Sequence, residues 1–318
     1  MTREYAVVVK DLTRTFGSFV AVDRLTLEVE RGKVFGFLGP NGAGKSTTIR
    51  MLCGLLLPSS GEGRVAGFDV MTESETIKRN IGYMSQKFSL YDDLTVEENI
   101  DFYAGLYSVP RDQRRERKEW VLDMAGLADK RGSLTRTLAG GWKQRLALGC
   151  AVQHEPPILF LDEPTSGVDP LSRRRFWDLI AQMSRRGTTV FVTTHYMEEA
   201  EYCDELALIY RGKMIARGTP QEVKALFPDD ILEIRVERPF EALERLEASG
   251  LVRETALFGD ALHVVVGEAG TGAPSLARLL EDQGFVVEAI QPVRPSLEDV
   301  FVSLIELEDR RNPAEAQE

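Results

Sequence analysis

A glycine-rich loop between an apolar run and an amphipathic segment constrains the fold of this chain more than any other feature. The loop reads Gly39-x-x-x-x-Gly44-Lys45-Ser46. The run 34–38 before it predicts a buried strand, and the apolar residues at helical spacing in 49–56 predict a helix that ends at Pro58. In a strand, loop and helix of this kind, the loop N–H groups and the positive end of the helix surround phosphate groups. The sequence therefore predicts an α/β fold with a nucleotide phosphate site.

The residues of this loop have separate roles in the predicted site. Lys45 neutralises the β- and γ-phosphate oxygens, and the hydroxyl of Ser46 is a ligand for Mg²⁺. The glycines allow the backbone to turn its N–H groups inward. We expect ATP and Mg²⁺ to bind here, through Gly39, Asn41, Gly42, Gly44, Lys45, Ser46 and Thr47.

Two further apolar runs end in residues that suit phosphate chemistry. Asp162 and Glu163 follow the run 158–161, and His195 follows the run 188–194. Because open α/β sheets bind ligands at the carboxyl ends of their strands, we expect these side chains beside the phosphate loop. Asp162 is the predicted metal ligand, Glu163 the predicted general base for the attacking water, and His195 faces the γ-phosphate. The alternatives are a helix-capping acidic pair and a structural histidine.

The order of the segments predicts three structural parts within residues 1–228. Alternating apolar residues in 12–30 predict antiparallel strands, and residues 90–149 are mostly helical in pattern. The apolar runs alternate with helices, which predicts a mostly parallel core sheet. One of these helices is predicted to start with Asp169 as its N-cap and Pro170 at its first position. We therefore expect a core sheet, an antiparallel β subdomain and a helical subdomain.

A second, smaller α+β domain is predicted to begin at residue 229. Its expected strands and helices follow the order βαββαβ, which is typical of a ferredoxin-like domain. Their ranges are 231–237, 239–249, 251–257, 261–266, 274–283 and 285–290. The glycine-containing stretch 267–272 is interpreted as a loop and not as a second nucleotide site. We therefore expect domains at 1–228 and 229–307, and a polar, disordered tail at 308–318.

The charge of the chain is unevenly distributed. The formal net charge is −11, and residues 229–318 carry 8 Lys and Arg against 20 Asp and Glu. Because an acidic surface repels phosphates, we expect no nucleic-acid partner.

The sequence contains no long apolar segment. It has no run of the roughly 18 to 20 apolar residues needed to span a bilayer, and residues 1–10 are too short in apolar length for a signal peptide. We therefore expect a cytoplasmic protein. Cys53, Cys150 and Cys203 are odd in number and widely spaced, which indicates reduced, buried thiols instead of disulfides or a zinc site.

A set of short motifs gives these predictions a family resemblance. Residues 138–142, Leu-Ala-Gly-Gly-Trp, resemble the signature motif Leu-Ser-Gly-Gly-Gln of ABC ATPases. The other motifs of that family are also present, in the order in which the family has them. They are the phosphate loop and residues 83–86, 158–163, 166–169 and 193–195. The resemblance covers about residues 4–225.

The resemblance implies roles for further residues. Phe16 would stack on adenine, Gln86 would sense Mg²⁺ and the γ-phosphate, and His195 would hold the γ-phosphate. The resemblance also implies a head-to-tail homodimer, or a pair with a related ATPase chain. In it, ATP lies between the phosphate loop of one subunit and the signature of the other, to which Ala139, Gly140, Gly141 and Asp169 would contribute.

The signature departs from the family pattern at two positions. Ala139 replaces the usual serine and Trp142 the usual glutamine. Losing a hydroxyl removes one hydrogen bond to a charged phosphate, worth about 1.5–3 kcal/mol. We expect slower hydrolysis, which Ala139→Ser would accelerate. Trp142 would pack on the nucleotide of the partner or fill the interface.

The C-terminal part narrows the resemblance. Residues 294–304 after the βαββαβ unit are similar to ATPase subunits of ABC-2-type exporters of the drug-resistance class. These subunits lie on the inner face of the cell membrane, where a separate permease moves a drug, lipid or other hydrophobic cargo. Residues 87–91 would form the socket for the permease, and replacing Phe88 and Tyr91 by alanine would uncouple export. Ordinary core packing is the alternative for this segment.

Two other functions fit a phosphate loop of this kind. A non-transport ABC ATPase acts on ribosomes or DNA, but this class favours tandem ATPase domains, coiled-coil insertions or basic surfaces. A regulator that hydrolyses ATP very slowly is compatible with Ala139, although Glu163 supplies a general base. The exporter ATPase is therefore the preferred interpretation.

Overall fold

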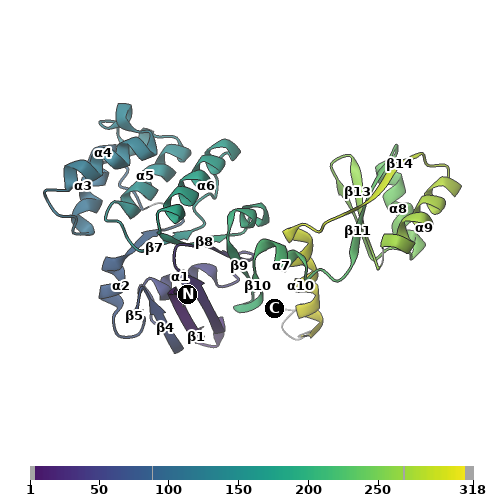
Figure 1. Cartoon of the computed structure of the whole chain (residues 1–318), viewed down its shortest axis with the longest axis horizontal. Coiled ribbons are helices and arrows are strands. Elements are labelled where there is room, and N and C mark those ends of the chain that lie inside the picture. Colours follow the sequence, from purple (N-terminus) through teal and green to yellow (C-terminus); the bar gives the residue numbers. More distant parts are fainter. Residues whose placement is uncertain (1–3, 88, 268, 312–318) are drawn as a thin grey trace. The chain divides into compact units, whose positions relative to one another are not determined.

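The computed structural model describes residues 4–87, 89–267 and 269–311, and it divides into two compact units, Met1–Pro220 and Gln221–Glu318 (Figure 1). The domain boundary expected between residues 228 and 229 stays a prediction.

The centre of the first unit is a six-stranded sheet. Its strand order is β10-β9-β3-β8-β7-β6, and all neighbours are parallel except β10, which pairs antiparallel with β9. The strands are β3 (Val34–Leu38), β6 (Ile81–Met84), β7 (Ile158–Asp162), β8 (Thr189–Thr194), β9 (Glu205–Tyr210) and β10 (Lys213–Gly218). Every residue of β3, β7 and β8 is buried, which explains the apolar residues at their centres and confirms the mostly parallel core sheet.

A second, antiparallel sheet packs against the same core. Its order is β2-β1-β4-β5, with bounds β1 (Tyr5–Phe16), β2 (Phe19–Glu30), β4 (Ser60–Val65) and β5 (Phe68–Asp69). Inward residues of β1 and β2 share one hydrophobic cluster with Phe35, Phe37 and Ile49. Ile49 belongs to α1 (Lys45–Leu52), the helix that follows the phosphate loop. The antiparallel subdomain predicted from residues 12–30 is therefore confirmed.

Helix α1 is shorter than the sequence predicts. It ends at Leu52 and not at Pro58, because Gly54 takes a left-handed φ of 68° just after the C-cap residue Cys53. Leu56 still packs against the hydrophobic core from the turn that follows, so its apolar spacing belongs to packing and not to the helix.

Helices cover the core sheet and form a bundle beside it (Figure 1). Their bounds are α2 (Ser74–Asn80), α3 (Val96–Leu106), α4 (Arg114–Ala125), α5 (Gly140–Val152) and α6 (Pro170–Arg185). Val96, Val121 and Leu146 bring α3, α4 and α5 into one buried cluster, which confirms the helical subdomain. Asp169 caps α6 and Pro170 begins it, as predicted.

The second unit contains the predicted βαββαβ arrangement. Its sheet has the order β12-β13-β11-β14 with antiparallel neighbours, and α8 and α9 supply Leu246 and Leu280 to its core. The bounds are β11 (Asp230–Val236), α8 (Pro239–Ser249), β12 (Glu254–Phe258), β13 (Ala261–Val266), α9 (Ala269–Asp282) and β14 (Val287–Val293). The prediction of a loop at residues 267–272 is wrong from Ala269 onward, because α9 starts there. This helix also includes Pro274.

The end of the chain is helical further than expected. After the short helix α7 (Pro220–Lys224) and the sheet of the second unit, α10 (Leu297–Arg311) closes the described chain. Its residues 308–311 fall in the expected disordered tail but are helical, and residues 312–318 of that tail lie outside the described residues.

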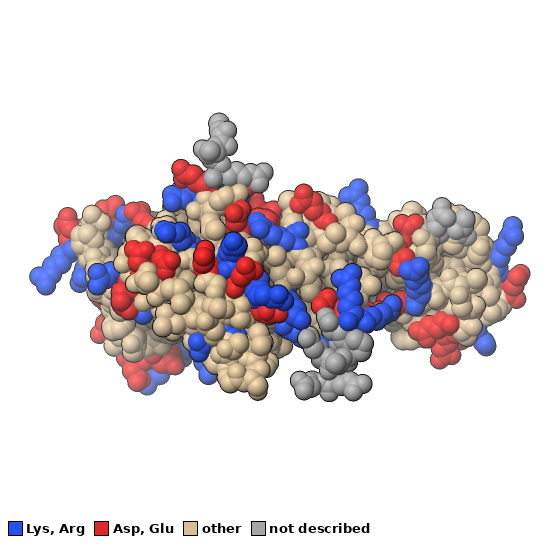
Figure 2. All heavy atoms as spheres, turned by 90° about the horizontal axis from the view of Figure 1, so that it is seen from below, with Lys and Arg blue, Asp and Glu red and all other residues tan. Residues whose placement is uncertain are grey.

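The surface carries both signs of charge. On the face drawn in Figure 2, Lys and Arg are interspersed with Asp and Glu. Within the described ranges, no helix combines the length and the apolar character needed to cross a membrane.

Candidate functional site

The phosphate loop connects β3 to α1 in a shape that requires glycine. At Gly44, φ is 106°, and a Cβ atom would lie 2.5 Å from the carbonyl oxygen of Ala21. A Cβ atom at Gly39 would lie 2.2 Å from the carbonyl oxygen of Ile209. Among the described residues, no side chain caps α1 and none in its first turn is acidic. The positive end of α1 is therefore suited to an anion.

Lys45 is buried at the start of α1 and contacts both the loop and Glu163. Its Nζ donates hydrogen bonds to the carbonyl oxygens of Gly39 and Pro40, at 2.8 and 3.0 Å. The same Nζ lies 3.1 Å from Oε1 of Glu163, and both side chains are at least nine-tenths buried. The loop and the carboxyl end of β7 therefore share one buried cation.

Ser46 and Asp162 bring two oxygen ligands together beside the loop. The Ser46 hydroxyl donates to Oδ1 of Asp162 at 3.0 Å. Thr193, in the neighbouring strand β8, donates to the same oxygen at 2.8 Å. The Asp162 carboxylate is thus held in place between α1 and β8.

Glu163 stands in a fixed and unusual conformation just beyond β7. It is a non-glycine residue with a left-handed φ of 48°. Its N–H donates to the carbonyl oxygen and to Oγ1 of Thr193, at 3.1 and 3.0 Å. A left-handed non-glycine residue costs about 1–3 kcal/mol, and such positions cluster at functional sites. The strained backbone directs the carboxylate toward the phosphate loop.

Two further predicted residues contact the other oxygen of this carboxylate. Gln86 donates from Nε2 to Oε2 of Glu163 at 3.1 Å. Nδ1 of His195 lies 3.3 Å from the same Oε2, without the angles of a hydrogen bond. The Glu163 carboxylate is therefore surrounded by an ammonium group, an amide and an imidazole.

Phe16 lies at the end of β1, where that strand turns into β2. Phe16 is 46% exposed, and the guanidinium carbon of Arg14 is 4.5 Å from the centroid of its ring. An exposed aromatic face of this kind can stack on a planar base.

The signature residues form the first turn of α5. Ala139 is the N-cap of this helix, is exposed, and has no side chain able to bond the free N–H groups. Space around Gly140 is open, whereas a Cβ atom at Gly141 would lie 2.5 Å from Oγ of Ser172. Gly141 therefore permits close packing of α5 against α6, and Gly140 leaves the helix end accessible.

Trp142 packs within its own subdomain. The indole lies against the buried cluster of α3, α4 and α5, and the Arg145 guanidinium carbon is 4.2 Å from its ring centroid. Burial of Arg145 lowers the pKa of its guanidinium. The tryptophan thus serves the fold of the helical subdomain.

Asp169 occupies the turn before α6. Its Oδ1 accepts a hydrogen bond from the Ser172 N–H at 2.9 Å, and this bond lowers the pKa of Asp169. The carboxylate is exposed, so it can also face another chain.

The structure joins six of the predicted residues into one cluster. Lys45, Gln86 and His195 contact Glu163, Ser46 contacts Asp162, and Thr193 bonds to both Asp162 and the Glu163 backbone. Within the described residues, these hydrogen bonds and ion pairs do not extend to Phe16, to the first turn of α5 or to Asp169.

Sequence reasoning missed the role of Thr193. It joins Asp162 to the Glu163 backbone from the adjacent strand. The available signal was its place near the end of β8, one strand away from Asp162, because a hydroxyl at that register meets a carboxylate at the same edge.

Family comparisons agree with this geometry. Residues 22–166 match the family model "ABC transporter", and residues 218–305 match "ATP-binding protein DrrA1-3-like, C-terminal domain". The chain is 37% identical to the daunorubicin/doxorubicin resistance ATP-binding protein DrrA of Streptomyces peucetius over 309 residues, covering 94% of this chain and 92% of that protein.

A second relative and a solved structure each match about two thirds or more of this chain. "Probable multidrug ABC transporter ATP-binding protein YbhF" of Escherichia coli K12 is 52% identical over 227 residues, 71% of this chain and 39% of that protein. The chain thus spans about two fifths of the length of YbhF. The dimeric, post-hydrolysis ATP-binding cassette MJ0796 with ADP and Pi has a TM-score of 0.61 at 26% identity, covering 67% of this chain and 98% of that one.

Proposed function

The chain belongs to the ATP-binding proteins of the ABC transporter family, and on that premise we propose that it hydrolyses MgATP to drive a separate membrane permease. The relatives are named for drug resistance and multidrug transport, so the proposed cargo is a drug, lipid or other hydrophobic molecule leaving the cell. The chain would then lie on the cytoplasmic face of the membrane through that permease.

The Glu163 carboxylate is the observation that carries this proposal. Its two oxygens contact Lys45, Gln86 and His195, and its strained backbone is fixed by Thr193. A carboxylate in this position can take the proton of an attacking water, while Lys45 stabilises negative charge on the phosphates. His195 would hold the γ-phosphate from the opposite side of the same carboxylate.

The residues beside the phosphate loop fit Mg²⁺. Ser46 Oγ and Asp162 Oδ1 are hard oxygen ligands 3.0 Å apart. The described residues contain no group of three or more His, Cys, Asp and Glu side chains able to hold a metal alone. Mg²⁺ is commonly bound through one or two carboxylates together with substrate phosphates. We assign Ser46, Asp162 and Gln86 as its protein ligands, and the ion would neutralise charge on the β- and γ-phosphates.

We further propose that two ATPase subunits complete each site. The first turn of α5 presents free N–H groups and an open glycine, Gly140, to solvent, and the exposed Asp169 lies next to it in space through Ser172 and Gly141. A helix N-terminus of this kind binds phosphate. The similar cassette MJ0796 is dimeric with ADP and Pi bound, which supports a dimer for this chain. A homodimer, or a pair with a related subunit, would place Ala139, Gly140 and Gly141 on the partner's γ-phosphate.

The proposed permease contact includes Tyr91, whose side chain is 48% exposed. Its ring packs edge-on against Phe102, at 4.6 Å between centroids, and leaves an aromatic surface beside α3. Phe88, the other aromatic residue expected in this socket, lies outside the described residues. Co-purification with a membrane permease in detergent, and its reduction by Tyr91→Ala, would test the contact.

Glu163→Gln tests the proposed hydrolysis. The substitution keeps the shape of the side chain but removes the base, so the steady-state ATPase rate should fall by about 10²- to 10⁴-fold. Nucleotide affinity, measured by equilibrium binding, should remain within a few-fold of the wild type.

A matched control separates this effect from general loss of acidic charge. Glu155→Gln removes an exposed carboxylate that pairs with Arg117 on the surface, and it should leave the rate unchanged. A Glu163→Gln protein that hydrolyses ATP at the wild-type rate would exclude Glu163 as the general base.

A further inference from the structure

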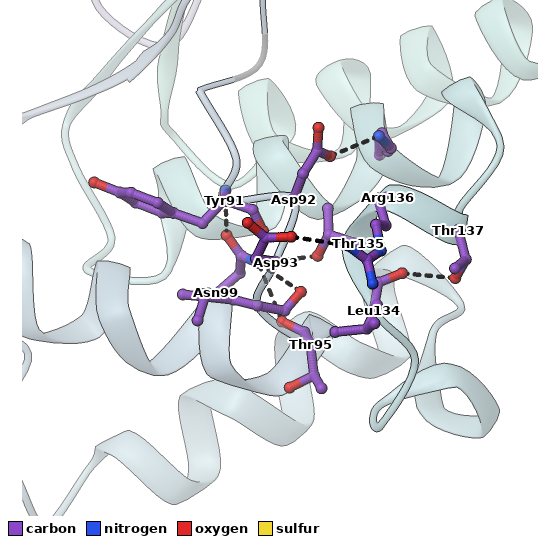
Figure 3. Close-up of polar contacts among 11 residues, drawn as sticks. Tyr91, Asp92, Asp93, Thr95, Asn99, Leu134, Thr135, Arg136 and Thr137 are labelled. Carbon is purple, nitrogen blue, oxygen red and sulfur yellow. Dashed lines mark hydrogen bonds and ion pairs between the residues drawn. The ribbon is translucent and has the colours of Figure 1, made fainter.

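A fully buried asparagine connects three segments of the helical subdomain. Oδ1 of Asn99, in α3, accepts a hydrogen bond from the Tyr91 N–H at 2.9 Å. Its Nδ2 donates to the carbonyl oxygens of Tyr91 and Thr95, at 3.0 and 3.1 Å, and to Oγ1 of Thr135 at 2.9 Å (Figure 3). Both polar ends of the buried amide therefore have partners, and the bond to Thr135 joins residues 36 positions apart.

The backbone follows the same connection. We call residues 91–95 the 91–95 loop and residues 134–138 the 134–138 segment. Thr135 and Arg136 of that segment donate their N–H groups to the carbonyl oxygens of Leu94 and Asp92, at 2.9 and 3.1 Å. The loop and the segment are thus paired side by side, and the Asn99 amide bonds to both of them (Figure 3).

Each member of this pair lies close in the sequence to a part of the proposed ATP site. The 91–95 loop follows Gln86, whose amide contacts Glu163. The 134–138 segment runs into Ala139, the N-cap of α5. Asn99 itself lies in neither the 91–95 loop nor the 134–138 segment. Among the described residues, it contacts none of the site residues that surround Glu163 and Asp162.

We propose that Asn99 is a positioning residue that makes the 91–95 loop and the 134–138 segment move as one body. This inference rests on the proposed function, since it concerns how a displacement near Gln86 reaches the first turn of α5. A fully satisfied buried polar network is rigid, so the loop cannot shift without carrying the N-terminus of α5 with it. Asn99 would therefore set the position of the signature against the partner's nucleotide.

Thr135→Val tests the proposal with the least disturbance to the fold. Valine has nearly the shape of threonine, and the change removes only the hydroxyl that accepts from Asn99. A small displacement of a phosphate-binding turn lowers turnover strongly, so kcat should fall about tenfold. The nucleotide Kd of a single subunit should stay the same within about twofold, because the phosphate loop belongs to a different part of the unit.

Hydrogen exchange gives a readout that is independent of ATPase activity. In the wild type, the amides of Tyr91 and Thr135 should exchange with similar protection factors. In Asn99→Leu and Thr135→Val, both amides should lose protection together, while amides of α1 keep theirs. A role limited to general stability would lower protection throughout the unit.

The surface ion pair between Arg136 and Asp93 provides a matched control. It joins the same two segments at 3.0 Å, but its side chains are exposed. Arg136→Ala should leave kcat within about twofold of the wild type, because exposed pairs contribute little.

Several results would overturn the proposal. One is a wild-type kcat in folded Thr135→Val and Asn99→Leu. Another is a loss of kcat in Arg136→Ala equal to that in these variants. A third is a loss of exchange protection at only one of the two amides, Tyr91 or Thr135. A wild-type protein without ATPase activity would refute the proposed function instead, and the exchange experiment would still decide whether the two segments move together.

Discussion

Ala139→Ser is expected to change both the stability of α5 and the chemistry at its N-terminus. Ala139 has the extended backbone of an N-cap, with φ −65° and ψ 155°, and no side-chain oxygen bonds the first turn. Asp169 shows what such a bond looks like at α6, where its carboxylate accepts from the Ser172 N–H at 2.9 Å. Because position 139 is exposed, a serine hydroxyl fits there without repacking.

The two effects differ in size and in what they require. An N-cap hydroxyl stabilises a helix by about 1 kcal/mol, which raises Tm by about 2–4 °C in a unit of this size. A hydrogen bond to a phosphate of the partner's ATP would contribute about 1.5–3 kcal/mol more. Expressed only in the transition state, that energy would raise turnover by about 10- to 150-fold. Because part of this energy is used in binding ATP itself, we expect turnover to rise by about tenfold.

Two assays on the same purified protein separate the effects. Thermal unfolding without nucleotide measures the cap, and steady-state ATPase activity at saturating MgATP measures the interface. A higher Tm with an unchanged or lower rate would refute the argument that residue 139 faces the partner's phosphate. An unchanged Tm together with a higher rate would show instead that the hydroxyl bonds the nucleotide and not the helix.

Three further predictions follow from the same structure. Gly140→Ala should raise Tm, since the added Cβ meets nothing within 4 Å and alanine favours a helix by up to about 1 kcal/mol. The same change should lower turnover at least about tenfold, because the methyl group would meet the partner's phosphate. Full activity would contradict the shared site. Burial lowers the pKa of His154 to about 4 from 6.5, so the unfolded chain binds the proton first as the pH falls. The free energy of unfolding should therefore fall by about 2 kcal/mol between pH 7 and pH 5. Urea titrations of His154→Gln should lack this effect. Burial also raises the pKa of all three cysteine thiols, Cys53, Cys150 and Cys203. Mass spectrometry should therefore find slow alkylation at pH 8 in the folded chain and complete alkylation after unfolding. Rapid labelling of the folded chain would be inconsistent with the buried positions of these cysteines.

The core sheet was predictable because its signal is local. Residues 34–38 and 158–161 are short, mainly apolar runs, 188–194 has Val-Phe-Val between threonines, and β3, β7 and β8 are buried throughout in a mostly parallel sheet. The site residues at the ends of these strands followed from the same rule, since parallel strands present their carboxyl ends at one edge.

Helix ends were less predictable, because they depend on backbone conformation and not on apolar spacing. Leu56 continues the helical spacing of α1, yet the left-handed Gly54 ends the helix before it. At α9 the error had the opposite sign. Gly270 and Gly272 indicated a loop, but the helix begins at Ala269, whose N–H donates to the Asp230 carboxylate at 2.7 Å. That contact joins residues 39 positions apart and leaves no mark on the local sequence.

The same distinction separates the two halves of the proposed ATP site. The phosphate-loop motif lies in one short run from Gly39 to Ser46, so its glycines and Lys45 can be read directly from the sequence. The position of Ala139 depends instead on Thr135 and on Asn99, which lies 36 residues before Thr135. A buried asparagine in an amphipathic helix looks like an ordinary polar residue until the structure shows which segments it bonds. If Asn99 holds the signature in place, substitutions distant from the nucleotide will change the rate of hydrolysis while leaving ATP binding intact, and no motif in the sequence would identify them.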